Sequence, residues 1–160
     1  MRRRLLVLAG LTCLAFGWAL PGALPDFTLN TLDGKAFKAS EVLGKHILII
    51  DFWATWCGPC KLSLKKFQDI QVKYPDVRVL AVSVDESSAY NAVKQYVQGK
   101  GFTFTVLLDT DSKVNKMFNP EAKIPFTLIV DKSGNIVYTH TGYTPGDEKE
   151  VIRKIEELSK

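Results

Sequence analysis

The sequence Cys57-Gly58-Pro59-Cys60 places two cysteines three residues apart, between two segments of different character. The preceding segment, 47–53, is apolar apart from Asp51, which is typical of a strand buried on both faces. The following segment, 59–74, carries apolar residues at near-helical spacing. Two cysteines on the first turn of a helix can bring their sulfurs within bonding range, and N–H groups at that helix end stabilise a thiolate. The motif in this strand-to-helix context predicts thiol–disulfide redox chemistry.

Two other roles for this cysteine pair are a zinc site and a purely structural disulfide. Structural zinc sites need four ligands, yet the sequence has no second C-x-x-C motif, and His46 and His140 lie in unrelated segments. A disulfide that closes so small a loop would constrain the unfolded chain little, because its stabilising effect grows with loop length. The redox interpretation is therefore favoured over both.

Apolar runs and turn residues divide the rest of the chain into alternating strands and helices. The pair Asp33-Gly34 predicts a hairpin between two short strands, and a turn at 131–135 predicts a second hairpin. The expected strands are 26–32, 35–38, 47–53, 77–84, 102–108, 126–130 and 136–141. The expected helices are 59–74, 87–98, 112–118 and 146–158, with a turn at 40–44. This order predicts an α/β fold with a mixed central sheet and helices on both faces.

The helices carry further expectations about their ends and faces. Ser87 or Ser88 is expected to cap the helix at 87–98, and Gly99 and Gly101 are expected to stop it. The apolar residues that define the helix faces are Leu62, Leu64, Phe67, Ile70 and Val72 in 59–74, and Val151, Ile152, Ile155 and Leu158 in 146–158.

The first 23 residues have the layout of a secretory signal peptide. Three arginines precede an uncharged apolar run at 5–20, and small residues at Gly17 and Ala19 fit a cleavage site, with a cut after Ala23 as the alternative. A retained membrane anchor is the second interpretation, although a run of 16 apolar residues is short for a spanning helix. Both interpretations place one domain, 24–160, outside the cytoplasm. Cys13 is then an apolar residue of the leader.

The charge of the remaining chain is nearly balanced. From Leu20 onward there are 18 basic and 17 acidic residues, a net charge of +1. Binding to nucleic acid relies on clustered lysine and arginine. No nucleic-acid partner is therefore expected.

Two segments resemble the signatures of thioredoxin-fold proteins. Residues 51–61, Asp-Phe-Trp-Ala-Thr-Trp-Cys-Gly-Pro-Cys-Lys, resemble the active-site segment, and 124–131, Ile-Pro-Phe-Thr-Leu-Ile-Val-Asp, resemble the cis-proline segment. The Pro-Asp-Phe-Thr-Leu segment at 25–29 and the strand-helix insertion at 77–118 resemble the TlpA/ResA-like extracytoplasmic branch, which is related to the AhpC/TSA redoxins. The resemblance covers 24–158 and implies a thioredoxin fold with an N-terminal β-hairpin.

The resemblance implies a role for each residue of these motifs. Cys57 would be the attacking thiolate, and Cys60 would be the resolving thiol. Pro125 would be cis, and Ile124 would offer backbone groups to an extended substrate segment. Three residues beside the cysteines would complete the substrate-binding surface, namely Trp56, Gly58 and Pro59.

Two carboxylates are candidates for tuning the thiols. Asp51 lies within an apolar strand, where burial would raise its pKa and suit it to proton exchange with Cys60. The alternative is that Asp51 ends the strand and faces water. Glu86 matches a glutamate that ResA-like proteins place near the active site, and its alternative role is that of a solvated residue at a helix start.

The resemblance implies an extracytoplasmic reductase of protein disulfides that needs no metal, flavin or nucleotide. The Gly58-Pro59 dipeptide is shared with reducing members of the superfamily. A reductase outside the cytoplasm needs a membrane electron donor, for which a DsbD or CcdA-type protein is the candidate. Apocytochrome c is one candidate substrate, and a monomer is expected.

Two other functions remain as alternatives. A thiol peroxidase of the AhpC/TSA type usually has P-x-x-x-T-x-x-C, whereas here Thr55 stands only two residues before Cys57. A copper chaperone of the SCO group needs C-x-x-x-C and a downstream histidine, and neither the cysteine spacing nor the place of His140 fits. Peroxide consumption and copper titration would identify these functions.

Overall fold

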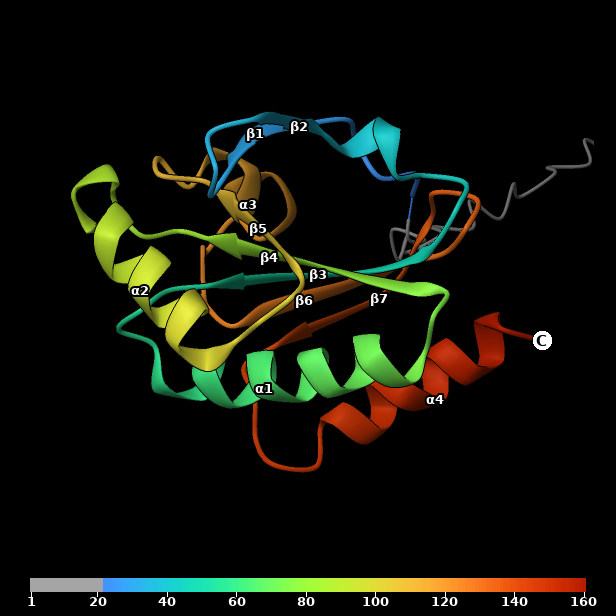
Figure 1. Cartoon of the computed structure of the whole chain (residues 1–160). Coiled ribbons are helices and arrows are strands. Elements are labelled where there is room, and N and C mark those ends of the chain that lie inside the picture. Colours follow the sequence, from blue (N-terminus) through green and yellow to red (C-terminus); the bar gives the residue numbers. More distant parts are fainter. Residues whose placement is uncertain (1–21) are drawn as a thin grey trace, which may run out of the picture.

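The computed structural model describes residues 22–160, which form one mixed sheet with helices on both sides (Figure 1). The strands are β1 Thr28–Thr31, β2 Ala36–Lys38, β3 Ile47–Trp53, β4 Val77–Ser83, β5 Thr105–Leu108, β6 Phe126–Val130 and β7 Ile136–Thr141. The helices are α1 Gly58–Lys73, α2 Tyr90–Lys100, α3 Lys113–Phe118 and α4 Glu148–Leu158, with 3-10 turns η1 Ala39–Glu41 and η2 Ser87–Ala89.

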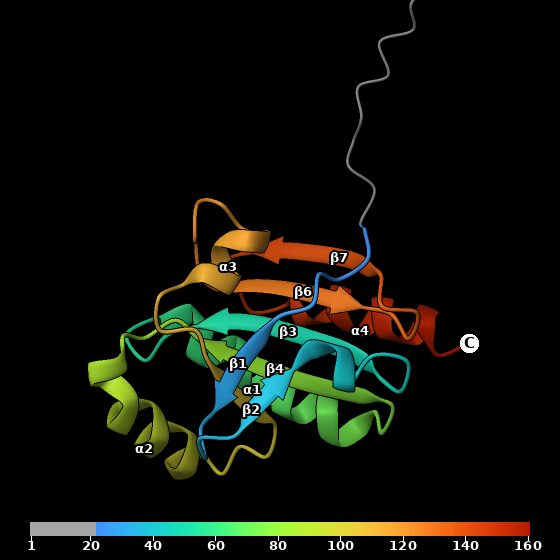
Figure 2. The same cartoon turned by 90° about the horizontal axis from the view of Figure 1, so that it is seen from above.

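The strand order is β2-β1-β5-β4-β3-β6-β7, which confirms the mixed sheet. The central strands β3, β4 and β5 are parallel, whereas β6 and β7 form an antiparallel hairpin beside β3. The N-terminal hairpin β1–β2 joins the opposite edge, where β1 pairs antiparallel with β5. This edge of the sheet lies over the same face of the central strands as α3, and α1 and α4 lie on the other face (Figures 1 and 2).

The protein has one hydrophobic core on each face of the sheet, and strand β3 contributes side chains to both. Every residue of this strand is buried. Alternate side chains point to opposite faces of a strand. Leu48, Ile50 and Phe52 therefore enter the core on the side of α3. Ile49 and Trp53 enter the core on the side of α1, which also contains both cysteines of the motif. Asp51 shares this second face by its position between them.

The face of α1 differs from the expectation at two positions. Leu64, Phe67 and Ile70 are buried at a spacing of three residues, together with Cys60 and Ser63. Leu62 and Val72 are exposed by 53% and 72%. Each lies two residues from a member of the buried stripe, which is about 200° around a helix. In α4, Val151 and Ile155 are buried as expected, and Ile152 and Leu158 are half-buried.

The start of the next helix also differs from the expectation. A 3-10 turn over Ser87–Ala89 precedes α2, and neither serine side chain caps a helix. Gly99 lies within α2, and only Gly101 ends it, with a φ of 65° that favours glycine. In the segment 102–108 the sequence leaves the early part open as a strand or a loop, and the structure shows a strand only from Thr105, where pairing with β4 begins.

The beginning of the described chain is bound to the β6–β7 hairpin. The N–H of Leu24 donates to the carbonyl of Gly134 at 2.8 Å, and Ile136 donates to Gly22 at 3.1 Å. The leader expected at 1–23 lies outside the described residues except for Gly22 and Ala23. Among the helices of residues 22–160, none combines the length and the apolar character needed to cross a membrane.

Candidate active site

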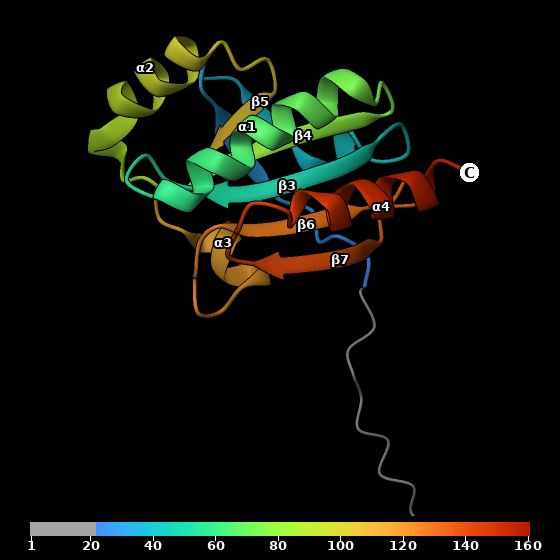
Figure 3. The same cartoon turned by 90° about the horizontal axis from the view of Figure 1, so that it is seen from below.

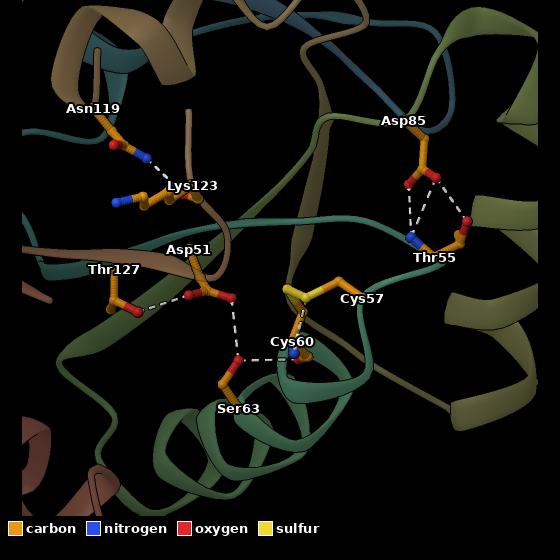
Figure 4. The surroundings of a disulfide bond; sticks show 9 residues. All are labelled: Asp51, Thr55, Cys57, Cys60, Ser63, Asp85, Asn119, Lys123 and Thr127. Carbon is orange, nitrogen blue, oxygen red and sulfur yellow. Dashed lines mark hydrogen bonds between the residues drawn. A yellow bond between two sulfur atoms is a disulfide. The ribbon is translucent and has the colours of Figure 1, made fainter. Parts of the chain in front are cut away.

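Cys57 and Cys60 form a disulfide at the N-terminus of α1, with their Cα atoms 5.3 Å apart (Figure 4). Cys57 is the N-cap of the helix, and the N–H of Cys60 donates to its sulfur at 3.3 Å. Pro59 falls in the first turn, where its missing N–H leaves no hydrogen bond unmade. Cys57 retains 7% exposure and Cys60 has none. Only Cys57 can therefore meet a substrate without movement of the helix.

The position of Cys57 at a helix N-terminus favours the charged form of its thiol. After reduction, the same Cys60 N–H can donate to a Cys57 thiolate, and the helix dipole adds to this stabilisation. The first turn of α1 contains no acidic residue that would oppose it, and Lys61 follows directly.

Asp51 is fully buried between two strands, as the sequence predicts. Its neighbours in the sheet are Ala81 on β4 and Thr127 on β6. Thr127 Oγ1 donates to Asp51 Oδ1 at 2.7 Å, and Ser63 Oγ donates to Oδ2 at 3.4 Å. Burial raises the pKa of Asp51 to about 7, and the two hydroxyl groups partly oppose this shift. Near neutral pH the group can therefore take up or release a proton.

Ser63 connects this carboxyl group to the backbone of Cys60. Its hydroxyl lies 3.0 Å from the carbonyl oxygen of Cys60 and 3.4 Å from Asp51 Oδ2, and Figure 4 shows it between them. A hydroxyl has one hydrogen to donate. When Asp51 is ionised, it competes with the Cys60 carbonyl for the hydrogen of the Ser63 hydroxyl. When Asp51 is protonated, it can donate its own hydrogen to Ser63, and the Ser63 hydrogen is then free to bond to the Cys60 carbonyl. The sequence did not single out Ser63 or Thr127, because hydroxyl residues in a helix and a strand give no signal of their own.

Asp85, rather than its neighbour Glu86, anchors the loop before the disulfide. The Asp85 carboxylate accepts the backbone N–H of Thr55 at 2.9 Å and the Thr55 hydroxyl at 2.6 Å. Ser83 donates to the same carboxylate at 2.8 Å. Glu86 is exposed and forms no side-chain hydrogen bond within the described residues. The signal that could have identified Asp85 is its place after β4, because parallel strands β3 and β4 end at the same edge of the sheet.

The segment before β6 lies against the same core. The Ile124–Pro125 peptide bond is cis, as the family resemblance implies. Pro125 is buried and Ile124 is half-buried against the core that contains both cysteines. The Pro125 carbonyl accepts the N–H of Gly142 at 2.7 Å. Within the described residues, the backbone N–H and C=O of Ile124 take part in no hydrogen bond.

The surface around Cys57 is formed by the remaining predicted residues. Trp56 is 73% exposed, and Gly58 and Pro59 are exposed beside it. Trp53, in contrast, is fully buried beneath the disulfide in the core on the α1 side. Over residues 22–160, no three histidine, cysteine, aspartate or glutamate side chains gather as metal ligands would.

Comparisons with known proteins agree with this geometry. A sequence model of the AhpC/TSA family matches residues 22–139. The thioredoxin-like protein YneN of Bacillus subtilis is 33% identical, with 79% of this chain and 74% of that protein covered. The thiol-disulfide oxidoreductase ResA of Geobacillus kaustophilus is 30% identical, with 78% of this chain and 70% of that protein covered. A solved structure from Chlorobium tepidum, described as a candidate thiol:disulfide interchange protein DsbE, is 26% identical and has a TM-score of 0.79. The match covers 89% of this chain and 99% of that protein.

These similarities extend over the strands, the helices and the disulfide together. The family match spans the N-terminal hairpin, the cysteine pair and the cis-proline segment. The structural similarity confirms the thioredoxin fold with its central sheet. The chain belongs to the AhpC/TSA family and, within it, to the ResA-like thiol–disulfide oxidoreductases of the thioredoxin superfamily.

Proposed function

We propose that this protein reduces disulfide bonds of proteins outside the cytoplasm. The observation that carries the proposal is the asymmetry of the Cys57–Cys60 disulfide at the N-terminus of α1. Cys57 reaches the surface and accepts a hydrogen bond at the helix end, while Cys60 is fully buried. An attacking thiol must be accessible to the substrate and ionised in the resting reduced protein. A resolving thiol can be buried and needs to lose its proton only when it attacks the mixed disulfide.

The reaction begins with the reduced form, in which Cys57 is a thiolate. Its sulfur attacks one sulfur of a substrate disulfide, so that a mixed disulfide forms and the other substrate sulfur leaves as a thiolate. Cys60 then loses its proton and attacks the Cys57 sulfur, which releases the first substrate sulfur as a second thiolate. The substrate gains two electrons, and the protein returns to the disulfide seen in the structure.

Asp51 is proposed to take the proton from Cys60 in the second step. Its pKa of about 7, raised by burial, leaves it partly ionised at neutral pH. Ser63 lies between Asp51 and the Cys60 backbone, and we assign it a positioning role. Glu86 remains a candidate for a weaker influence on the thiols from the exposed surface.

The substrate is proposed to lie across Trp56, Gly58 and Pro59. The exposure of these residues beside Cys57 supports this placement. On the other side of the disulfide, the unpaired backbone groups of Ile124 would receive an extended substrate segment, as a sheet edge receives an added strand. Pro125 holds that segment of the chain in place through its buried ring.

The reductive direction and the partners extend the proposal. The Gly58-Pro59 dipeptide favours reduction, and an extracytoplasmic reductase requires a membrane donor of the DsbD or CcdA type. Apocytochrome c is one candidate substrate, and the protein is proposed to act as a monomer without an added cofactor. Residues 1–23 would be the signal peptide, or 5–20 the tether to the membrane, before a domain over 24–160.

The experiment is an equilibrium titration of the purified protein against glutathione or dithiothreitol, with Cys57→Ser as the control. A reduction potential of about −270 mV, as in thioredoxin, supports a reductase. A potential near about −120 mV, as in DsbA, would mean an oxidant and contradict the proposed direction. The absence of a reversible couple would exclude the proposed chemistry, and peroxide consumption and copper binding would then be measured.

A further inference from the structure

A groove of about 590 Å³ lies beside the active site, between α1 and α2. Both helices contribute to the core on the same face of the sheet, and Figure 3 shows this side of the molecule. The groove begins at Lys61, which directly follows Cys60. Its lining residues are Lys61, Leu62, Lys65, Tyr96, Lys100 and Phe102.

The floor of the groove is aromatic and continues to the disulfide. The Tyr96 ring packs on Phe102 at 6.0 Å and on Trp53 at 5.5 Å between centroids. Trp53 is fully buried in the core that also holds Cys57 and Cys60. A ligand on this floor would therefore lie on the same face of the sheet as the disulfide, beside Lys61, the residue after Cys60.

The wall near Phe102 is held firmly against α1. Gln68 donates to the Thr103 hydroxyl at 2.9 Å, and the Thr103 N–H donates back to the Gln68 side chain at 2.9 Å. This pair joins α1 to the loop between α2 and β5. These two hydrogen bonds hold the Phe102 side of the groove beside α1.

The charge of the groove is strongly one-sided. The residues that line it include three lysines and no aspartate or glutamate. Within residues 22–160, Lys61, Lys65 and Lys100 are in none of the ion pairs. Lys61 instead lies over the Tyr96 ring, 5.3 Å from its centroid. This positive surface stands out because the chain from Leu20 onward has a net charge of only +1.

We propose that this groove binds an acidic segment of the substrate protein whose disulfide Cys57 attacks. The inference rests on the proposed function and names the class of substrate. Lys65 and Lys100 would pair with carboxylates of the substrate segment. Leu62, which is 53% exposed, would contact an apolar side chain of that segment as it lies on the aromatic floor. A flat membrane surface fits less well, because Tyr96 and Phe102 are half-buried and line a recess.

The test compares two peptides that contain the same disulfide, flanked by glutamates in one and by lysines in the other. The reduced full chain is mixed with each peptide, and kcat/KM for reduction is measured at low and at high salt. The wild type should prefer the acidic peptide by about tenfold or more at low ionic strength. The preference should vanish at about 1 M salt, where the screening length is about 3 Å.

Two double variants separate the groove from the overall charge. Lys65→Glu/Lys100→Glu reverses two groove charges and should abolish or invert the preference. Lys66→Glu/Lys94→Glu makes the same change in net charge on the same two helices, but at positions outside the groove lining, and should retain the preference. Lys61 is left unchanged because it adjoins Cys60 and could alter the thiols directly.

The outcomes distinguish this inference from the proposed function. If the wild type exchanges with dithiothreitol but reduces both peptides equally, the groove proposal is wrong and the proposed function stands. If both double variants lost the preference for the acidic peptide to the same extent, the groove proposal would also be wrong, because the loss would then come from the overall charge of the protein. If anionic phosphatidylserine vesicles, rather than acidic peptides, bind the wild type and not Lys65→Glu/Lys100→Glu, the surface binds lipid and the proposal fails. Failure to exchange with dithiothreitol would overturn both proposals.

Discussion

The carboxylate of Asp85 lies 2.6 Å from the hydroxyl of Thr55, and this contact fixes the loop that carries Cys57. The two residues belong to loops that follow neighbouring parallel strands, β4 and β3. Asp85 is 4% exposed, so its carboxylate depends on the three donor groups of Thr55 and Ser83.

Replacement of Asp85 by alanine should therefore destabilise the protein. The variant leaves the Thr55 N–H and hydroxyl without their acceptor, and buried donors left unpaired cost about 1–3 kcal/mol. Urea unfolding of the oxidised protein would measure this loss. Glu86→Ala is the matched control, because the exposed neighbouring side chain should change stability by less than about 0.5 kcal/mol. An equal loss in both variants would contradict the anchoring role of Asp85.

Asp51 should make folding stability decrease as the pH rises. Burial raises its pKa from 3.8 to about 7 in the folded protein. Between these values the folded state holds a proton that the unfolded chain has released, so stability falls across this window. The full effect corresponds to about 4 kcal/mol as an upper limit.

Asp51→Asn isolates this contribution, because the amide resembles the protonated acid. Urea unfolding at pH 4 and pH 8 should show the wild type losing more stability than the variant. The difference between the two proteins removes the effect of all other titrating groups. A parallel pH dependence in both would show that Asp51 titrates normally.

The two hydroxyl donors should set the pH at which the resolving step becomes fast. Thr127 and Ser63 donate to the ionised carboxylate, and both lower the pKa of Asp51 against the effect of burial. Thr127→Val and Ser63→Ala should each move the inflection of the rate profile to higher pH. The shift should be larger for Thr127→Val, because its bond is 2.7 Å long and that of Ser63 is 3.4 Å.

Single-turnover reduction of a disulfide peptide from pH 5 to pH 9 would measure these inflections. Thr139→Val is a suitable control, since Thr139 is exposed on the edge strand β7 and its replacement should leave the profile unchanged. If neither hydroxyl variant moves the inflection, Asp51 is not the group that titrates in this step.

The sequence predicts the fold well because its signals are local. The apolar run of β3, the turn at Asp33-Gly34 and the cysteine spacing each specify nearby structure, and all three predictions are confirmed. Asp51 was identifiable because a carboxylate inside an apolar strand stands out.

The rest of the site depends on contacts between distant residues. Thr127 and Asp51 form a hydrogen bond although they are 76 positions apart in the sequence. Neither sequence segment alone indicates that the two residues are in contact. The family resemblance points to Glu86, and the sequence alone does not indicate Asp85, because two adjacent acidic residues after a strand differ only in the direction of their side chains. The backbone of the loop after β4 sets the directions of these two side chains. The pattern of apolar residues in the sequence does not predict the conformation of that loop.

The different burial of the two cysteines predicts which of them can be trapped on a substrate. In Cys60→Ser, the accessible Cys57 should attack a disulfide peptide and remain joined to it, because no second thiol is present to release it. Mass spectrometry without reductant should show one peptide added to the chain. In Cys57→Ser, the sulfur of Cys60 is fully buried, and the adduct should be absent or form far more slowly. An adduct on Cys60 at a similar rate would reverse the two roles, and the proposed order of attack would have to be abandoned.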